Sequence, residues 1–247
     1  VLALQLDPYY MAPLWPDPVS LAALQAQALI DESRATEADF ARVAARNRRS
    51  AMDNPYAQVK GDRSPEELMR DDYVVAPLRR HALPPITDGV AAVVLASGDR
   101  ARALTEHPAW ITGIDHRIET HALGARDLTK SPSTRRAAVG ARLLADETQP
   151  SVHVDVAELH APFAHQELIL TEALGIGDAV DVNPSGGALA ANALMVGGLV
   201  RIGEAASRVM GGTASTALAH ATSGPCLQQN LVCALSSAVP AEKGSGA

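Results

Sequence analysis

Polar side chains able to take part in catalysis interrupt or follow strand-like runs at three places in the sequence. His160 comes directly after the Val-rich run that ends at Leu159. Asn192 lies five residues beyond the glycine turn that ends at Gly187, and His220 interrupts a run of small apolar residues. Histidine exchanges protons near neutral pH, and an amide donates hydrogen bonds to a developing oxyanion. We predict that His160, Asn192 and His220 form one catalytic set.

Glycine-rich turns accompany two of these residues. Residues 183–187 read Asn-Pro-Ser-Gly-Gly, and a Ser-Gly-Pro turn follows His220 at 223–225. Because glycine lets the backbone approach a ligand closely, such turns can form an oxyanion hole or a phosphate cradle. Substrate contacts are therefore predicted at Ser185, Gly186, Gly187, Ser223 and Gly224.

Each motif also has a purely structural interpretation. A lone histidine at a strand end is more often hydrogen bonded within the fold than catalytic, and Asn-Pro-Ser-Gly-Gly can be only a turn. Cys226 and Cys233 lie among apolar neighbours, which favours small core residues over nucleophiles. The individual motifs leave both interpretations open.

Composition narrows the class of protein. Apolar residues make up 47% of the 247 residues, enough for a sizeable core, and the net charge of -7 argues against a general nucleic-acid binder. The basic stretch at 42–49 fits a solvated helix face. No apolar run approaches the roughly 20 residues of a membrane span, and the beginning has no signal-peptide pattern, so we expect a cytoplasmic protein. The first residue, Val1, suggests processing or a fragment of a longer chain.

Strand and helix patterns alternate along the chain, which favours an α/β fold. Capping residues and helical apolar spacing predict helices at 18–33, at 36–52, from Ser64, at 98–106, at 132–146, before Gly175, and at 193–210. Strands are predicted at 90–97, 109–119, 151–159, 217–224 and 227–237. The run at 90–97 is expected to be buried, because its β-branched residues are continuous rather than alternating.

Taken in order, the motifs resemble one family. The sequence reads Glu-Leu-His-Ala-Pro-Phe at 158–163, Asn-Pro-Ser-Gly-Gly at 183–187, Ala-Asn-Ala at 191–193 and Leu-Ala-His-Ala-Thr-Ser-Gly-Pro near its end. Thr-Asp-Gly-Val-Ala-Ala at 87–92 is similar to that family's Ser-Asp-Gly-Ala-Ala-Ala. The family is the thiolases of the sterol-carrier-protein-x type, and the resemblance runs from about Val19 to Leu235.

Departures from the family pattern fall on its reactive residues. Pro162 stands where the family has its acid/base cysteine, and Ala161 replaces the neighbouring aspartate. Asn192 stands where the family has the histidine of Gly-His-Pro, and a position near Ala221 replaces the cysteine of the last glycine turn. Neither cysteine of the chain aligns with the family's nucleophile. The family's nucleophilic cysteine would lie ahead of the matched region, and this chain shows neither the thiolate nor the base that a Claisen condensation needs.

The resemblance implies a thiolase-like layered α-β-α-β-α fold whose N-terminal part is incomplete, lacking roughly the first third. Residues 1–147 would be the remainder of the N-terminal domain with its loop region, 148–238 the C-terminal domain, and 239–247 a flexible tail. Some similar actinobacterial lipid-transfer proteins are retro-aldolases acting on steroid side-chain CoA thioesters, and they pair with a small OB-fold/zinc-ribbon protein.

By this resemblance the expected substrate is an acyl-CoA, and the expected reaction is acyl transfer or retro-aldol carbon–carbon cleavage in lipid or steroid side-chain metabolism. The expected assembly is a homodimer, and neither a bound cofactor nor a metal is implied. His160 and His220 would then be the base and the proton donor, and Asn192 would donate a hydrogen bond to the thioester oxygen. Two alternatives stay open at this point: a catalytically inactive binding or scaffold subunit, and one component of a split thiolase.

Overall fold

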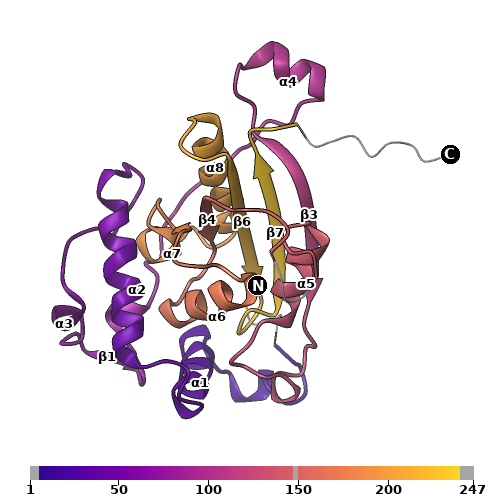
Figure 1. Cartoon of the computed structure of the whole chain (residues 1–247). Helices are drawn as coiled ribbons and strands as arrows, with labels where there is room; N and C mark the ends of the chain where they lie inside the picture. The colour runs from indigo at the N-terminus through magenta and orange to yellow at the C-terminus, as the bar shows by residue number, and fades with distance from the viewer. Residues whose placement is uncertain (1–5, 147–149, 240–247) are drawn as a thin grey trace.

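A mixed five-stranded sheet forms the centre of the computed structural model, which describes residues 6–146 and 150–239 (Figure 1). The strand order is β3-β7-β6-β4-β5. Strands β6 and β7 pair antiparallel, as do β7 and β3, whereas β4 runs parallel to both β6 and β5. The strands are β3 (Trp110–Ile118), β4 (Val156–Leu159), β5 (Asp181–Val182), β6 (Thr216–Ser223) and β7 (Gln229–Ser236).

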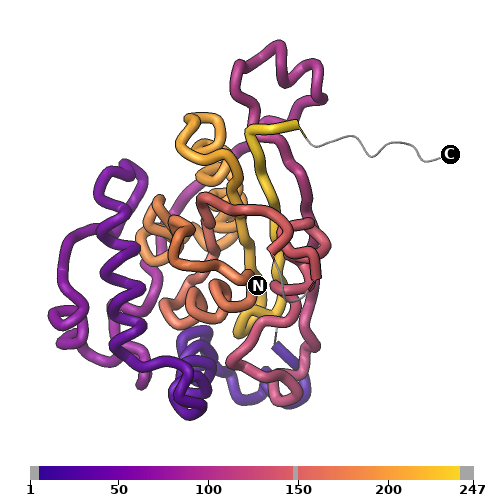
Figure 2. Tube along the Cα trace, viewed as in Figure 1, coloured from indigo at the N-terminus to yellow at the C-terminus, as the bar shows by residue number. Residues whose placement is uncertain are grey.

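Helices cover both faces of this sheet. Helix α8 (Gly197–Met210) packs on β4, β6 and β7, and its Ala205 and Val209 join Ala217 and Ala219 of β6 in one apolar cluster. On the other face α5 (Pro132–Gly140) packs on β3 and β7, and α6 (Ala164–Leu174) packs against α5. Helix α2 (Glu37–Ser50) lies outside α6, as Figures 1 and 2 show.

The N-terminal helices begin where the capping residues predict. Asp17 accepts hydrogen bonds from the N–H groups of Val19 and Ser20 at the start of α1 (Pro18–Asp31). Thr36 and Ser64 form capping boxes at α2 and at the short α3 (Pro65–Leu68). The remaining elements are a ribbon of β1 (Tyr73–Val75) and β2 (Leu78–Arg79), α4 (Gly98–Leu104) and α7 (Gly187–Ala190).

The prediction of a buried strand at 90–97 is wrong. This segment forms no strand in the structure, and the side chains of Val90 and Val94 are 91% and 90% exposed. A β-branched run is buried only where other strands flank it, and the described residues supply no strand beside this one. Just before this segment the chain is held by two hydrogen bonds between Thr87 and Asn192 and by the close approach of Gly89 to Ala193.

Three other predicted elements are shorter than expected. The helix predicted through Asp146 ends at Gly140, because Arg142 adopts a left-handed conformation (φ 61°) that breaks the helix. The strand predicted from Ser151 begins at Val156, and the helix predicted over 193–210 begins at Gly197. Most of the predicted tail, residues 240–247, lies outside the described residues.

The expected α/β fold is confirmed, with helices on both faces of a mixed five-stranded sheet. The carboxyl ends of the parallel strands β4, β5 and β6 meet at one edge of that sheet. His160 follows β4, the glycine turn follows β5, and the Ser-Gly-Pro turn follows β6. Ligand sites of α/β sheets lie at this edge, so the topology gathers the three predicted motifs there.

Candidate functional site

His160 and Asn192 form a buried pair beyond the carboxyl end of β4. The ring Nε2 of His160 lies 3.4 Å from Oδ1 of Asn192, and the side chains are 6% and 1% exposed. The opposite ring nitrogen, Nδ1, accepts a hydrogen bond from the N–H of Thr222 on β6, also at 3.4 Å. The backbone of His160 is tied to the same strand by its N–H, which donates to the carbonyl of His220.

These contacts fix the protonation state of His160. Because Nδ1 accepts the Thr222 N–H, the ring proton of the neutral imidazole is on Nε2, which donates to Asn192. Burial, followed by the nearby charge of Arg201, lowers the pKa of His160 to about 4. At neutral pH this ring is therefore a hydrogen-bond donor at Nε2, with its other nitrogen already occupied.

The amide of Asn192 completes the pair. Its Nδ2 is buried and has no hydrogen-bond partner among the described residues. An amide N–H₂ group left without an acceptor inside a protein costs roughly 1–3 kcal/mol, and a ligand oxygen or a water that reached it would remove this cost. The backbone of Asn192 is held by two hydrogen bonds to Thr87, which fix the position of the side chain.

The beginning of α8 lies over the imidazole of His160. A Cβ atom placed on Gly197, the first residue of α8, would be only 2.6 Å from Nε2 of His160. The first N–H groups of any α-helix have no intrahelical acceptor, and the side chain of Val196 at the N-cap of α8 supplies none. The positive end of the helix dipole therefore lies beside the donor pair.

A buried ion pair lies behind His160 on the same face of the sheet. Oε2 of Glu158 is 2.7 Å from Nη1 of Arg201 on α8, and both side chains are almost fully buried. Glu158 also accepts hydrogen bonds from the N–H and the hydroxyl of Ser185, at 3.0 and 2.7 Å. Burial raises the pKa of Glu158, while Arg201 and Ser185 act in the opposite direction.

The glycine turn at 183–187 uses its donors within the fold. Its left-handed residues are Asn183, Gly186 and Gly187, with φ of 53°, 95° and 61°. The N–H of Ser185 donates to Glu158, that of Gly186 to the carbonyl of Asn183, and that of Gly187 to the hydroxyl of Ser185. Substrate binding by Ser185, Gly186 and Gly187 stays a prediction, and the structure shows this turn as the support of Glu158.

The side chain of Asn183 anchors this turn to its surroundings. Its Oδ1 accepts the N–H of Leu159 at 2.7 Å, and its Nδ2 donates to Glu167 of α6 at 2.6 Å. Glu167 in turn accepts hydrogen bonds from Asn47 and Arg46 of α2. A Cβ atom on Gly186 would lie 2.5 Å from Ala51 and 3.1 Å from the carbonyl oxygen of Asn47, so the end of α2 and the residue after it pack directly on the turn.

His220 lies on the opposite face of the sheet from the His160–Asn192 pair. Side chains alternate along β6, and His220 shares its face with Leu218, in the cluster that α5 and α6 cover. Its Nε2 is 3.0 Å from Oδ1 of Asn230, whose amide donates to Ser133 of α5. Burial lowers the pKa of His220 to about 3. The structure therefore brings two of the three predicted catalytic residues together.

Near the turn after β6, the residue that contacts the His160–Asn192 pair is Thr222. Ser223 ends β6 in an exposed position, and Gly224 has a left-handed φ of 75° next to Gln228. The nearby hydrogen bond to His160 comes from Thr222, so the backbone of this motif, rather than its glycine, reaches the donor pair. Substrate binding by Ser223 and Gly224 stays a prediction.

Neither cysteine lies at the donor pair. The thiol of Cys226 donates to the carbonyl of Leu21, and Cys233 belongs to the cluster under α8. Burial raises the pKa of both thiols to about 11, which leaves almost no thiolate at neutral pH. Residues 6–146 and 150–239 contain no group of three or more His, Cys, Asp or Glu side chains arranged to hold a metal ion.

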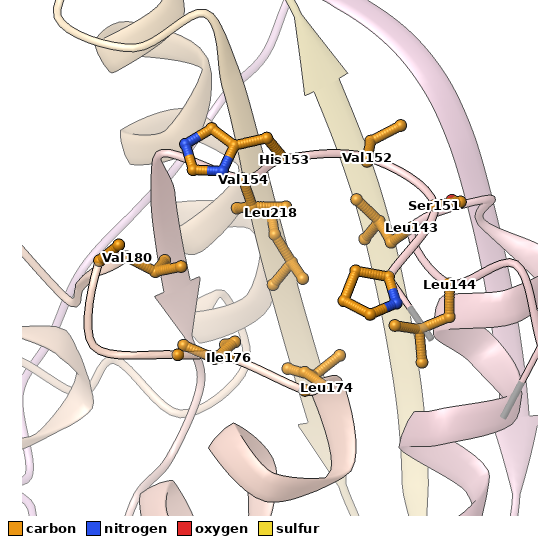
Figure 3. Close-up of a pocket in the computed structure, with 14 residues that line it drawn as sticks. Leu143, Leu144, Ser151, Val152, His153, Val154, Leu174, Ile176, Val180 and Leu218 are labelled. Atoms are coloured by element: carbon orange, nitrogen blue, oxygen red, sulfur yellow. The ribbon is translucent and has the colours of Figure 1, made fainter. Parts of the chain in front are cut away.

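A cavity of about 430 Å³ opens at the other end of β4 (Figure 3). Leucine and valine side chains from α6, β6 and the loops around β4 line it, together with His153. Val154, in its wall, precedes β4, whereas His160 follows it. At about 3.3 Å per residue the two are roughly 20 Å apart along the chain, so this cavity is separate from the donor pair.

Sequence reasoning did not single out Thr222, Gly197 or Arg201. Thr222 lies inside the motif after His220, and its role depends on a strand pairing that the motif alone does not show. Arg201 carried a readable signal, because a single arginine in the apolar stretch 194–202 of a helix needs a buried partner. Gly197 and Gly198 at the start of that helix indicate close backbone contact.

Comparisons with known proteins agree with this architecture. An acetyl-CoA acetyltransferase from Methanothermobacter thermautotrophicus is 32% identical over 187 residues, covering 68% of this chain and 48% of the relative. The benzoylsuccinyl-CoA thiolase subunit BbsB of Thauera aromatica is 33% identical over 155 residues, covering 62% and 40%. The chain thus spans about half the length of the curated relatives it matches. No family model matches the sequence.

Solved structures show the same fold. An Ltp2-ChsH2(DUF35) aldolase aligns with a TM-score of 0.73 and 24% identity over 94% of this chain and 66% of that one. A monomeric SCP2-thiolase-like protein of Mycobacterium smegmatis aligns with a TM-score of 0.69 and 21% identity over 91% and 51%. At these identities the likeness shows the fold alone.

The sheet, its flanking helices and the buried His160–Asn192 pair at the strand ends define an α/β protein with a polar pair at the carboxyl edge of its sheet. With the sequence relatives above, they identify its family: the chain belongs to the thiolase superfamily. Within the described residues, no helix has the length and apolar character needed to cross a bilayer.

Proposed function

We propose that this protein binds CoA thioesters and stabilises the enolate formed at the thioester oxygen, using His160 and Asn192 as paired donors. The observation that carries the proposal is the buried Nδ2 of Asn192, which has no partner among the described residues and belongs to a side chain 3.4 Å from His160. A thioester oxygen there would accept from Nδ2 of Asn192, and also from the Nε2–H of His160 once that group leaves its long 3.4 Å bond to Oδ1 of Asn192. Negative charge on that oxygen would be favoured by the start of α8.

Carbon–carbon bond cleavage by a retro-aldol reaction fits this site better than acyl transfer through a thiolate. In that reaction a base takes the proton of a β-hydroxyl group, the bond between the α and β carbons breaks, and its electrons form the thioester enolate. Protonation of the α carbon then gives a shorter acyl-CoA and a carbonyl product. Acyl transfer needs a reactive thiolate. Cys226 and Cys233, the cysteines of the described residues, are buried with raised pKa values, and the chain spans about half the length of its curated relatives.

His160 supports this chemistry in a particular role. Because its pKa is lowered and its Nδ1 is occupied, it acts as a neutral donor to the oxygen rather than as the base. The predicted role of His220 as a second catalytic group stays a proposal, and it would require this side chain to act from the opposite face of the sheet. A role in lipid or steroid side-chain metabolism and a cytoplasmic location belong to the same proposal.

Assembly with other subunits is the second part of the proposal. The names of two similar proteins, a thiolase subunit and a two-component aldolase, support association with a second chain. The exposed valines of the 90–97 segment are consistent with a covered surface in the assembled protein. We propose a homodimer with a small OB-fold/zinc-ribbon accessory protein. Sedimentation of the full-length protein alone and with that accessory protein tests the assembly.

A product assay of the full-length protein tests the reaction. The protein is incubated with a panel of β-hydroxyacyl-CoA and acyl-CoA esters, and products are separated by mass. We expect cleavage of a β-hydroxyacyl-CoA that is lost in Asn192→Ala and retained in the Cys226→Ser/Cys233→Ser double variant. Loss of turnover in the cysteine variant, with its melting temperature unchanged, would instead support acyl transfer. Absence of both turnover and thioester binding would support a scaffold subunit.

A further inference from the structure

Two of the contacts between helix α8 and the segment of β4 and His160 involve polar groups at or beside the site. Glu158 precedes His160 by two residues, so their side chains lie on the same face of β4. Arg201 follows Gly197 by four residues, so both lie on the same face of α8. Glu158 pairs with Arg201 at 2.7 Å, and His160 meets Gly197.

The spacing of these contacts matches on the two elements. Two residues of a strand span about 7 Å, and four residues of a helix rise about 6 Å. The ion pair and the His160–Gly197 contact are therefore successive points of one helix–strand interface. A shift of α8 by one turn along β4 would break both contacts together.

The ion pair is better suited to selecting this register than to adding stability. A buried pair of charges often contributes little net stability, because both charges lose their hydration. A shifted helix, however, would leave Glu158 and Arg201 buried without partners, which costs several kcal/mol. Ser185 completes the carboxylate's hydrogen bonds through its N–H and hydroxyl, and Arg201 also donates to that hydroxyl at 2.6 Å.

We propose that Glu158, Ser185 and Arg201 are positioning residues that hold α8 in the register at which Gly197 and the helix N-terminus close over His160. This inference rests on the proposed function for its effect on thioester binding. The register itself is a property of the free protein and is measurable without substrate.

The charged and titratable groups around His160 determine the pKa and the tautomer of its ring. Arg201 approaches from α8 and His220 from β6, and Glu158 compensates the charge of Arg201. Glu204, also on α8, acts on Glu158. Removing the ion pair changes the environment of the ring through its charge and, if α8 moves, through the contacts to Asn192 and Thr222.

The test is ¹⁵N NMR of the His160 ring in the full-length protein, combined with titration of a non-reactive CoA thioester analogue. The main variant is Glu158→Leu/Arg201→Met, which replaces the pair by apolar side chains and is expected to fold. Glu158→Gln, which keeps the size of the side chain and removes its charge, gives a second reading if the double variant fails to fold. Arg208→Met, on the same helix at a partly exposed position, is the control for loss of a cation.

We expect the wild type and Arg208→Met to show one neutral tautomer, protonated at Nε2, from pH 5 to 8. In the double variant we expect a mixture of tautomers, a pKa that rises toward 6.5, and analogue binding weaker by on the order of tenfold to a hundredfold. A single Nε2–H tautomer with unchanged binding in a folded variant overturns the inference. If the wild type binds no analogue, the proposed function fails, and the ring spectra alone decide the register.

Discussion

Replacing Gly197 by alanine tests the close contact on which the site geometry depends. The added Cβ would lie 2.6 Å from Nε2 of His160, whereas ordinary contacts begin at 3.4 Å, so the ring or the helix must move by about 0.8 Å. Gly203, further along α8, offers a matched control because nothing lies within 4 Å of an added Cβ there. Both changes are the same chemical substitution in one helix.

The expected energies have opposite signs. Forcing a methyl group into a packed contact costs about 1–3 kcal/mol, while alanine for glycine in an open helix position gains up to about 1 kcal/mol. The two variants should therefore differ by about 1–4 kcal/mol in free energy of unfolding. At roughly 2–4 °C per kcal/mol for a chain of this size, their melting temperatures should differ by about 2–16 °C.

Thermal unfolding and titration with a CoA thioester analogue measure the two consequences. We expect Gly197→Ala to melt lower and bind the analogue at least tenfold more weakly, since a 1 Å displacement of an aligned group costs up to about a hundredfold. Gly203→Ala should melt at or above the wild type and bind normally. Equal melting temperatures and equal affinities for the two variants would refute the close approach of α8 to His160.

Three further predictions follow from the same geometry. Asn192→Ala should weaken binding of a CoA thioester at least tenfold but leave the affinity for free CoA unchanged. Calorimetry measures both affinities. A parallel loss of both would show that the thioester oxygen is not the ligand of this amide. Stability should fall as the pH drops from about 6.5 to 4, because buried His160, His165 and His220 have pKa values lowered to about 4, 3 and 3 and take up protons only on unfolding. In denaturant titrations the free energy of unfolding should fall by about 4 kcal/mol per pH unit, and this slope should become shallower in His220→Gln. A slope unchanged by that substitution would contradict the burial of His220 as a neutral ring. Val94→Lys should increase the solubility of this chain on its own, measured by light scattering, with little change in melting temperature; a large loss of stability would mean that this side chain is buried.

Local signals in the sequence predicted the helices of the N-terminal part well. Asp17, Thr36 and Ser64 each cap a helix, because capping depends on hydrogen bonds to N–H groups two or three residues away. The failure at 90–97 has a non-local cause. Its valines read as buried, but burial of a strand depends on neighbours that the described residues do not provide.

The candidate site shows the same division between local and non-local information. The motifs located His160 and Asn192, and parallel pairing of β4 with β6 explains why His160 comes near Thr222. The motifs did not show that His220 points to the opposite face, because that depends on the register of β6 within the sheet. Arg201 was missed because its partner, Glu158, is 43 residues away in the sequence.

Vibrational spectroscopy of a bound thioester addresses the proposed role of the donor pair most directly. Two donors on the thioester oxygen polarise the carbonyl bond, so its stretching frequency should fall when a ¹³C-labelled CoA thioester analogue binds the full-length protein. We predict a clear downshift in the wild type and in Gly203→Ala, and a smaller one in Asn192→Ala at saturating analogue. A carbonyl frequency equal to that in water, or a downshift unaffected by Asn192→Ala, would contradict the proposal that His160 and Asn192 bind the thioester oxygen.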